Sequence, residues 1–165
     1  MFSFNDLMII ASKCEMLYLW CVAFYETVPK TEETAVSLEA IFKALPNVKA
    51  FTYFLPDNSI NIITTKTAEE LLKIPHFLSL DEFTIKEINE IFDIESFYGH
   101  IKKNKNTKIN LYFSDQISEE YKTQLQTIVD QILETENRDY KVPWISFSGI
   151  TNSSFGKMLA LYREN

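Results

Sequence analysis

The sequence predicts an α+β fold: a single domain, residues 1–165, with helices packed against a mixed sheet of about five strands. Three observations lead to this prediction. A chain of 165 residues that is 46% hydrophobic is about one domain long and can bury a core without metals or disulfides. Segments 49–55 and 60–66 flank a turn sequence, which indicates an N-terminal antiparallel hairpin. Segments 108–113 and 142–147 are separated by a helical pattern, which indicates a β-α-β unit.

The first expected element is a long helix that begins near Ser3 and continues to about Thr27. Ser3 and Asp6 have the spacing of a capping box, and Met16 to Tyr25 is an uncharged, mostly apolar run. This run is too short to cross a bilayer and has no basic segment or cleavage site of a secretory signal, which predicts a cytoplasmic protein.

The two cysteines of the chain fall within this expected helix. Cys14 and Cys21 are two helical turns apart, or about 10 Å by helical rise. Because that separation is too long for a disulfide, we expect a pair of buried free thiols.

A second helix and the hairpin come next. Pro29 ends the first helix, and Glu32 and Glu33 lie near the start of the second, which stops before Pro46. The apolar residues of the second helix are Val36, Leu38, Ile41, Phe42 and Leu45. The hairpin that follows has Pro56, Asp57, Asn58 and Ser59 as its turn.

Two further capping boxes predict two further helices. Thr67 and Glu70 open a short helix that ends before Pro75. Thr84 and Glu87 open another helix, in which an apolar face points inward and the carboxylates face water. That apolar face consists of Ile85, Ile88, Ile91 and Phe92.

The last part of the chain carries the clearest patterns. Lys108 to Phe113 alternates polar and apolar residues, as a half-buried strand does, and Ser118 is placed to cap the helix that follows. The apolar residues of that helix have strict helical spacing: Tyr121, Leu125, Ile128, Val129, Ile132 and Leu133. A crossover of this kind makes the strands at 108–113 and 142–147 parallel neighbours, and Phe155 to Tyr162 is expected to add a last strand rather than a short helix.

Charge is the most informative functional feature of the sequence. Residues 81–95 carry six carboxylates against a single lysine, Lys86, while four lysines lie between positions 102 and 108. A surface polarised in this way suits docking, and the net charge of −7 attracts basic partners and repels nucleic acids and anionic membranes. The expected partner-binding residues are Glu82, Glu87, Glu90, Asp93 and Glu95.

A second, different hypothesis is a ligand crevice at the carboxyl ends of the parallel strands. The crevice would be formed by Ser114, Asp115, Ser148, Asn152 and Lys157. The loop from Ser148 to Lys157 contains small polar residues and two glycines, which can cradle a phosphate, but its spacing differs from that of a P-loop.

No catalytic or cofactor motif is found around the two histidines, His76 and His100, and neither has a second Cys or His at metal-ligand spacing. Residues 76–92, followed by the strand at 108–113, resemble the opening of the aspartate and ornithine carbamoyltransferases. That resemblance would imply a carbamoyl phosphate loop with two arginines directly after the strand. Here the corresponding residues are Ser114-Asp-Gln-Ile-Ser118, without arginine, so no activity and no site residue is carried over.

These observations favour a small, acidic, non-enzymatic protein that binds and masks a basic protein partner, as immunity proteins and other inhibitors do for toxins. Exposed aromatic residues are expected to supply the buried centre of such an interface. The alternative is a nucleotide-binding or phosphate-binding module or enzyme that uses the crevice near Ser114 and Ser148. Neither hypothesis requires a cofactor or a metal. A third possibility is an oligomeric or structural subunit without a small ligand.

Overall fold

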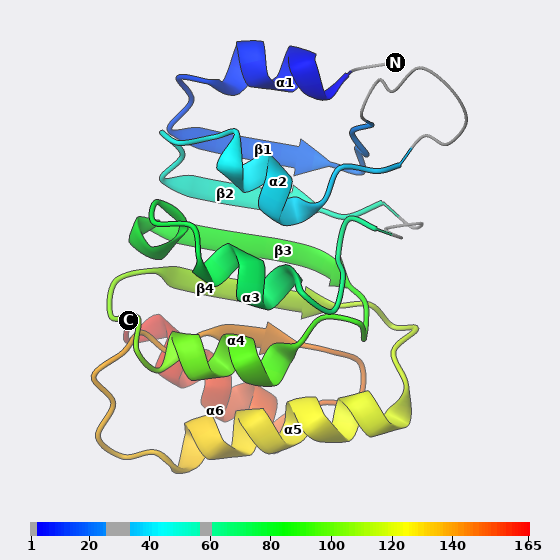
Figure 1. Ribbon diagram of the computed structural model, residues 1–165. Coiled ribbons are helices and arrows are strands. Elements are labelled where there is room, and N and C mark those ends of the chain that lie inside the picture. The colour runs from blue at the N-terminus through cyan, green and yellow to red at the C-terminus, as the bar shows by residue number, and fades with distance from the viewer. Residues whose placement is uncertain (1–2, 26–33, 57–60) are drawn as a thin grey trace.

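The fold is built on one five-stranded sheet in which every neighbouring pair of strands is parallel. The computed structural model describes residues 3–25, 34–56 and 61–165. In these residues the strands lie side by side in sequence order (Figure 1). The strands are β1 (Met16–Trp20), β2 (Ala50–Phe54), β3 (Glu82–Ile88), β4 (Lys108–Phe113) and β5 (Trp144–Ser146).

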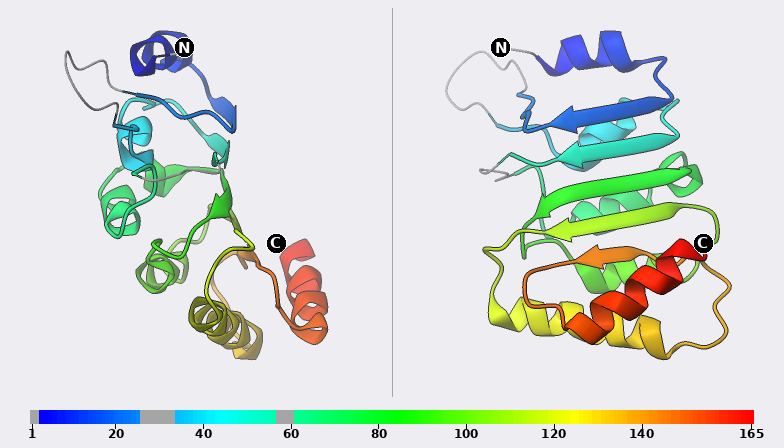
Figure 2. Two further views of the ribbon diagram at one scale, coloured as in Figure 1. Left: turned by 90° about the vertical axis from the view of Figure 1, so that its right-hand side faces the viewer. Right: turned by 180° about the vertical axis from the view of Figure 1, so that it is seen from behind.

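The helices are distributed unequally over the two sides of this sheet. They are α1 (Phe4–Ala11), α2 (Leu38–Lys43), α3 (Thr67–Leu72), the 3-10 helix η1 (Phe77–Ser79), α4 (Ile94–Ile101), α5 (Glu119–Glu134) and α6 (Asn152–Arg163). Helices α2 to α5 form one layer on one face, which we call the covered face (Figure 2). Helix α6 crosses to the opposite face near β5, and no helix of the described ranges covers that face over β1 to β3; we call it the open face.

The core lies between the covered face and the helix layer. Alternate strand residues point into it, among them Phe51, Tyr53, Phe83, Ile85 and Leu111, each at most 2% exposed. Phe rings from the helix layer pack on them: the ring centre of Phe42 lies 4.5 Å from that of Phe51. Each such side chain contributes roughly 1.5–3 kcal/mol through burial, so this layer dominates stability.

Several predicted elements are confirmed. Helices and a sheet of five strands are present in the described residues, Ser3 and Asp6 form the expected capping box, and Ser118 caps α5 through its hydroxyl. Strand β4 has the predicted bounds, and it pairs in parallel with β5 as the β-α-β unit requires.

The predicted hairpin, and with it the mixed sheet, is wrong. Strand β2 pairs in parallel with β1 on one side and β3 on the other, so no edge of β2 is left for an antiparallel partner. Residues 61–66 form turns that lead into α3, and Asn61 has the positive φ of 73° of a left-handed turn. Ile62 and Ile63 nevertheless lie in the core, which explains the strand-like composition of this segment. Of the predicted turn residues, 57–59 lie outside the described part.

The predicted first helix is also wrong beyond its first two turns. Helix α1 ends at Ala11, and Met16–Trp20 is strand β1. When both faces of a strand are apolar, its apolar residues do not alternate with polar ones, and the sequence pattern does not distinguish the strand from a helix. The two cysteines flank β1, where Cys14 is half-buried and Cys21 is exposed, so the prediction of two buried thiols on one helix face is wrong as well.

A β-bulge explains why residues 84–92 were expected to be helical. The register between β3 and β4 shifts between Lys86 and Ile88, and the extra residue, Glu87, has a φ of +61°. In a regular strand, residues on the same face are two positions apart. The bulge places the covered-face residues Ile85 and Ile88 three positions apart, which is a spacing typical of a helix.

Residues 155–162, expected to be a strand, belong to helix α6. Thr151 caps this helix by accepting a hydrogen bond from the backbone N–H of Ser154 at 3.1 Å. In the described ranges no helix is long and apolar enough to cross a membrane.

Candidate interaction surface

The open face presents an ordered grid of side chains because the five strands are in parallel register. The row that ends the strands runs Trp20, Phe54, Lys86, Tyr112 and Ser146 from β1 to β5. The middle row contains Tyr18, Thr52, Thr84, Asn110 and Trp144, and the first row contains Met16, Ala50, Glu82 and Lys108. The β1 end of this grid is therefore apolar, whereas its centre is polar.

The apolar end is a cluster that we call the aromatic strip: the exposed Met16, Tyr18 and Trp20 together with the half-buried Phe54. The rings of Trp20 and Phe54 stack at 4.5 Å between centres, and those of Tyr18 and Trp20 lie 6.3 Å apart. Met16 is 77% exposed, and both Tyr18 and Trp20 are more than half exposed. Large side chains of this kind are rarely left so accessible unless they contact a partner.

The centre of the grid is held by a polar network. The side-chain amide of Asn110 donates to Oγ1 of Thr84 at 2.8 Å and to Oε1 of Glu82 at 3.0 Å. The hydroxyl of Tyr162, on α6, donates to Oδ1 of Asn110 at 2.6 Å. Because Thr84 and Asn110 are both at least nine-tenths buried, these bonds satisfy groups that water does not reach.

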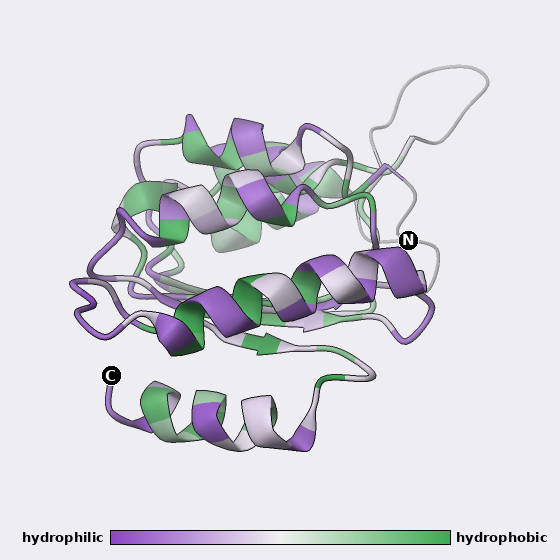
Figure 3. Cartoon of the chain, turned by 90° about the horizontal axis from the view of Figure 1, so that it is seen from below, coloured by the Kyte–Doolittle hydropathy of each residue, from purple (hydrophilic) through white to green (hydrophobic). Residues whose placement is uncertain are grey.

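Helix α6 forms a wall along one side of the open face. Figure 3 shows α5 and α6 on opposite sides of the sheet, each with polar and apolar residues. The buried ring of Trp144 packs edge-on against Phe155, at 5.3 Å between ring centres, and in a tilted arrangement against Tyr162 at 5.6 Å. Two lysines lie over rings beside this wall, Lys86 over Tyr112 and Lys108 over Tyr162. Strands β4 and β5 are thus covered from both sides, unlike β1 to β3.

The predicted acidic residues do not lie on one helix face, because Glu82 and Glu87 are part of a strand. Glu82 begins β3 and Glu87 lies in the bulge near its end, a separation of about 16 Å at the usual rise of a strand. Glu82 belongs to the polar network of the open face. Asp93 caps α4 by accepting from the backbone N–H of Ser96 at 3.0 Å.

Glu90 and Glu95, by contrast, lie together in a hollow of about 680 Å³ between the starts of α4 and α5. Glu120 and the 48% exposed Ile91 also line this hollow, which combines three carboxylates with an apolar side chain. The hydroxyl and backbone N–H of Ser118 hold the pKa of Glu90 below its usual value, so this carboxylate is ionised at neutral pH. We call this site the acidic hollow.

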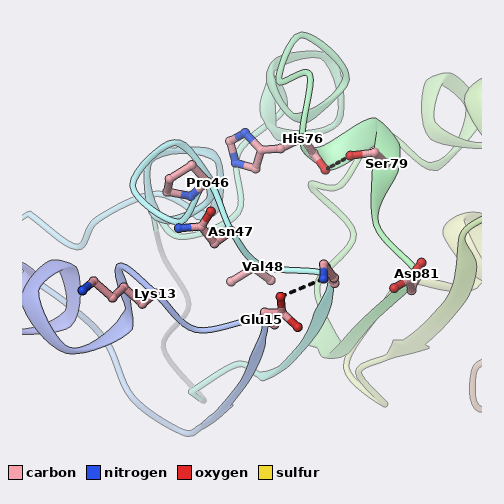
Figure 4. A pocket seen from close by; sticks show the side chains of 9 residues that line it. Lys13, Glu15, Pro46, Asn47, Val48, His76, Ser79 and Asp81 are labelled. Carbon is pink, nitrogen blue, oxygen red and sulfur yellow. Dashed lines mark hydrogen bonds and ion pairs between the residues drawn. The ribbon is translucent and has the colours of Figure 1, made fainter.

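A second hollow, of about 640 Å³, lies at the amino ends of β1 to β3 (Figure 4). Lys49 and Glu15 form an ion pair at 2.7 Å across it. His76, at the start of η1, donates from Nε2 to the carbonyl oxygen of Phe42 at 2.7 Å. The hydroxyl of Ser79 bonds to the carbonyl of His76 rather than to its ring. These lining residues are engaged in structural contacts and do not form a nucleophile–base pair.

The residues of the predicted ligand crevice follow β4 and β5 as expected, but α6 carries two of them. Ser114 donates its backbone N–H to the carbonyl of Ile88 at 2.9 Å, which extends the sheet by one bond. Asn152 and Lys157 are on α6, and neither hollow described above is lined by any of the five residues. Across the described residues no group of three or more His, Cys, Asp or Glu side chains could hold a metal ion.

The aromatic strip was not predicted from the sequence because the run from Met16 to Tyr25 was expected to be helical. The available signal was the density of aromatic residues, which favours a strand over a helix in a run of this length. A general expectation of some exposed aromatic residues was correct, but not their position. No family model, curated protein or solved structure matches the chain.

Proposed function

We propose that this chain is a non-enzymatic protein-binding domain that masks a basic partner, and that the open face is its contact surface. The observation that carries the proposal is the aromatic strip, which lies on a sheet face that no helix in the described part of the chain covers over β1 to β3. Interfaces are enriched in Trp, Tyr and Met, and their energetic centres are aromatic side chains that become fully buried in the complex.

The charge distribution supports a basic partner. The net charge of −7 accelerates the approach of a cationic surface, and the acidic hollow offers three carboxylates for Lys or Arg side chains. Glu87 lies in the bulge of β3, directly after Lys86 of the strand-end row that begins with Trp20. A partner seated on that row would therefore meet the carboxylate of Glu87, whereas the acidic hollow lies in the helix layer between the starts of α4 and α5. An immunity protein or inhibitor that neutralises a basic toxin would use such an arrangement.

The experiment is affinity capture from lysate of the protein's own source, with three baits compared at low and high salt. The first bait is the unaltered chain, and the second carries Tyr18→Ser and Trp20→Ser in the aromatic strip. The third bait is a matched control, Leu78→Ser, which removes a 42% exposed apolar side chain from η1. We expect one basic protein that the first and third baits retain and the second loses. Equal retention by all three baits would contradict the open face as the contact surface.

The contribution of charge is tested separately with the captured partner. Reversing Glu87 and Glu120 to lysine should slow association at low salt by about tenfold and have little effect at high salt, where charges are screened. Stopped-flow association rates measure this effect. An unchanged rate at low salt would remove the basic-partner part of the proposal and leave the aromatic contact intact.

The alternative of a phosphate-ligand crevice near Ser114 and Ser148 has its own test. A ligand that binds only the folded state raises the melting temperature, so nucleotides and sugar phosphates should be screened by thermal shift. A shift that Lys157→Ala abolishes would favour this alternative over the protein-binding proposal.

A further inference from the structure

The edge of β1 is a bare strand edge within the described part of the chain. Strand β1 pairs with β2 on one side, and no described strand pairs with its other side. The backbone N–H and C=O groups on that side therefore have no ladder partner. Figure 2 shows the row of strands ending at β1, with α1 displaced toward the helix layer rather than in line with the sheet.

Charge, proline and a bulge, three of the usual protections against edge pairing, are absent from β1. Its sequence, Met-Leu-Tyr-Leu-Trp, contains no charged residue and no proline, and its five residues pair with β2 without a bulge. By comparison, the centre of the sheet contains Glu82, Lys86 and Lys108. An uncharged edge is also the place where two copies of a chain with a net charge of −7 can meet without close repulsion.

Apolar exposure is concentrated around this edge. Besides Met16, Tyr18 and Trp20, two residues of α1 are strongly exposed: Ile9 at 76% and Ile10 at 65%. These five are most of the large apolar side chains that the described residues leave exposed. Leu17, which faces the helix layer from β1, is only half-buried. An added strand beside β1 would cover Leu17 and bring further apolar side chains beneath α1.

From these observations we propose that two copies of the chain pair their β1 strands antiparallel about a twofold axis through Tyr18, forming one continuous ten-stranded sheet. In this register Tyr18 lies opposite the partner's Tyr18, and Met16 lies opposite Trp20 of the partner subunit. Glu15 lies opposite the partner's Cys21, so no like charges are placed face to face. Residues opposite each other in an antiparallel pair point to the same side, so the two aromatic strips join on one open face.

The partner of β1 is thus a second copy, a conclusion that does not depend on the identity of any binding partner. The sequence of β1 is self-complementary about Tyr18, which supports a second copy of the chain as its partner. The position of α1, the helix that carries the exposed Ile9 and Ile10, beside this edge supports the same partner. Dimerisation is measured with the purified chain alone, so its failure is distinct from failure of the protein-binding proposal.

The test uses sedimentation equilibrium over a concentration series. The unaltered chain should approach twice its monomer mass of 19.3 kDa as concentration rises. Tyr18→Glu and Tyr18→Lys should each be monomeric where the unaltered chain is dimeric, because each places two like charges opposite one another at the axis. An equimolar mixture of the two variants should recover a dimer, since the opposed charges are then complementary.

Two controls make the outcome decisive. Leu78→Glu adds the same charge at an exposed apolar position of η1 and should leave dimerisation unchanged. Tyr18 is 58% exposed, so both variants should keep the circular dichroism melting curve that the unaltered chain gives at concentrations where it is monomeric. A monomer at every concentration would overturn the proposal. So would a Tyr18→Glu variant that dimerises as well as the unaltered chain.

Discussion

On β1 and β2, neighbouring residues lie in opposite environments. Leu19 is 7% exposed on the covered face, and Trp20, the next residue, is 57% exposed on the open face. On β2 the same step separates the fully buried Tyr53 from the half-buried Phe54. Composition does not distinguish the two faces here, because both are apolar. The difference teaches that apolar side chains on the covered face serve stability, whereas those on the open face are available for contact with another molecule.

The largest expected effect tests the stabilising face. Phe83 is 1% exposed, and its ring packs against Phe42, Phe51, Phe77 and Phe97. Phe83→Ala should lower the free energy of unfolding by about 3–5 kcal/mol, because it leaves a cavity in a close-packed cluster. Urea unfolding measures the loss, with Phe54→Ala as the open-face control on the adjacent strand. Similar losses for both variants would mean that the two faces do not differ as described.

The next effect concerns the polar network that attaches α6 to the open face. Asn110→Ala removes the acceptor of Tyr162 and the donor to Thr84, and it should cost about 1–3 kcal/mol. Tyr162→Phe removes only the hydroxyl, so a double-mutant cycle isolates the energy of that single bond. Costs that simply add would show that the two side chains are not coupled.

The third prediction concerns the pH dependence of stability and His100, a residue of α4 in the helix layer. Burial, with a smaller contribution from the charge of Lys103, lowers the pKa of His100 below its ordinary value of 6.5. The side-chain amide of Asn104 lies 3.3 Å from Nε2, a contact suited to the neutral ring. The folded state therefore binds this proton less readily than the unfolded state, and stability should fall as pH drops from about 7 toward 5.

The matched variant for this prediction is His100→Gln, which has no titratable ring. The free energy of unfolding of this variant should lose the decline between pH 7 and 6, while the decline at lower pH, where carboxylates such as Glu90 and Asp139 protonate, should persist. Identical pH profiles for the variant and the unaltered chain would show that His100 is not the group responsible.

The smallest effect on stability is expected on the open face itself. Trp20→Ala should change the free energy of unfolding by less than about 1 kcal/mol, because most of the side chain is already in water. The two tryptophans report on the two ends of the sheet, since Trp144 is only 8% exposed. Acrylamide should quench Trp20, studied in a Trp144→Phe variant, more strongly than Trp144, studied in a Trp20→Phe variant. Equal quenching would place Trp20 in a covered environment.

The parts of the fold that could be predicted are those in which only one face of an element is apolar. Strand β4 alternates clearly, and α5 has polar residues opposite an apolar stripe, so their patterns lead directly to the parallel β4–β5 pair. Strand β1 has apolar residues on both faces and loses that signal. In β3 the bulge at Glu87 changes the repeat from two to three, and a short-range pattern cannot reveal a local backbone feature of this kind.

The candidate site was predictable only in part, for related reasons. The sequence shows how many carboxylates residues 81–95 carry, but their distribution in space depends on whether residues 82–88 form a helix or a strand. As a strand they separate Glu82 from the acidic hollow, where Glu90 and Glu95 meet Glu120 from a different helix. That last contact is tertiary, and no spacing along the sequence indicates it. The aromatic strip required knowledge of which face the helices cover.

The shortness of β5 limits how far copies of this chain can assemble. The β5 end of the sheet has only three paired residues and is flanked by α5 and α6, whereas the β1 end has five and no described strand pairs with its outer side. Growth of a sheet into a fibre requires two adhesive edges on every molecule. In the dimer that we propose, the single adhesive edge of each molecule is already paired, so assembly would stop at two copies and the chain could keep an apolar edge without polymerising.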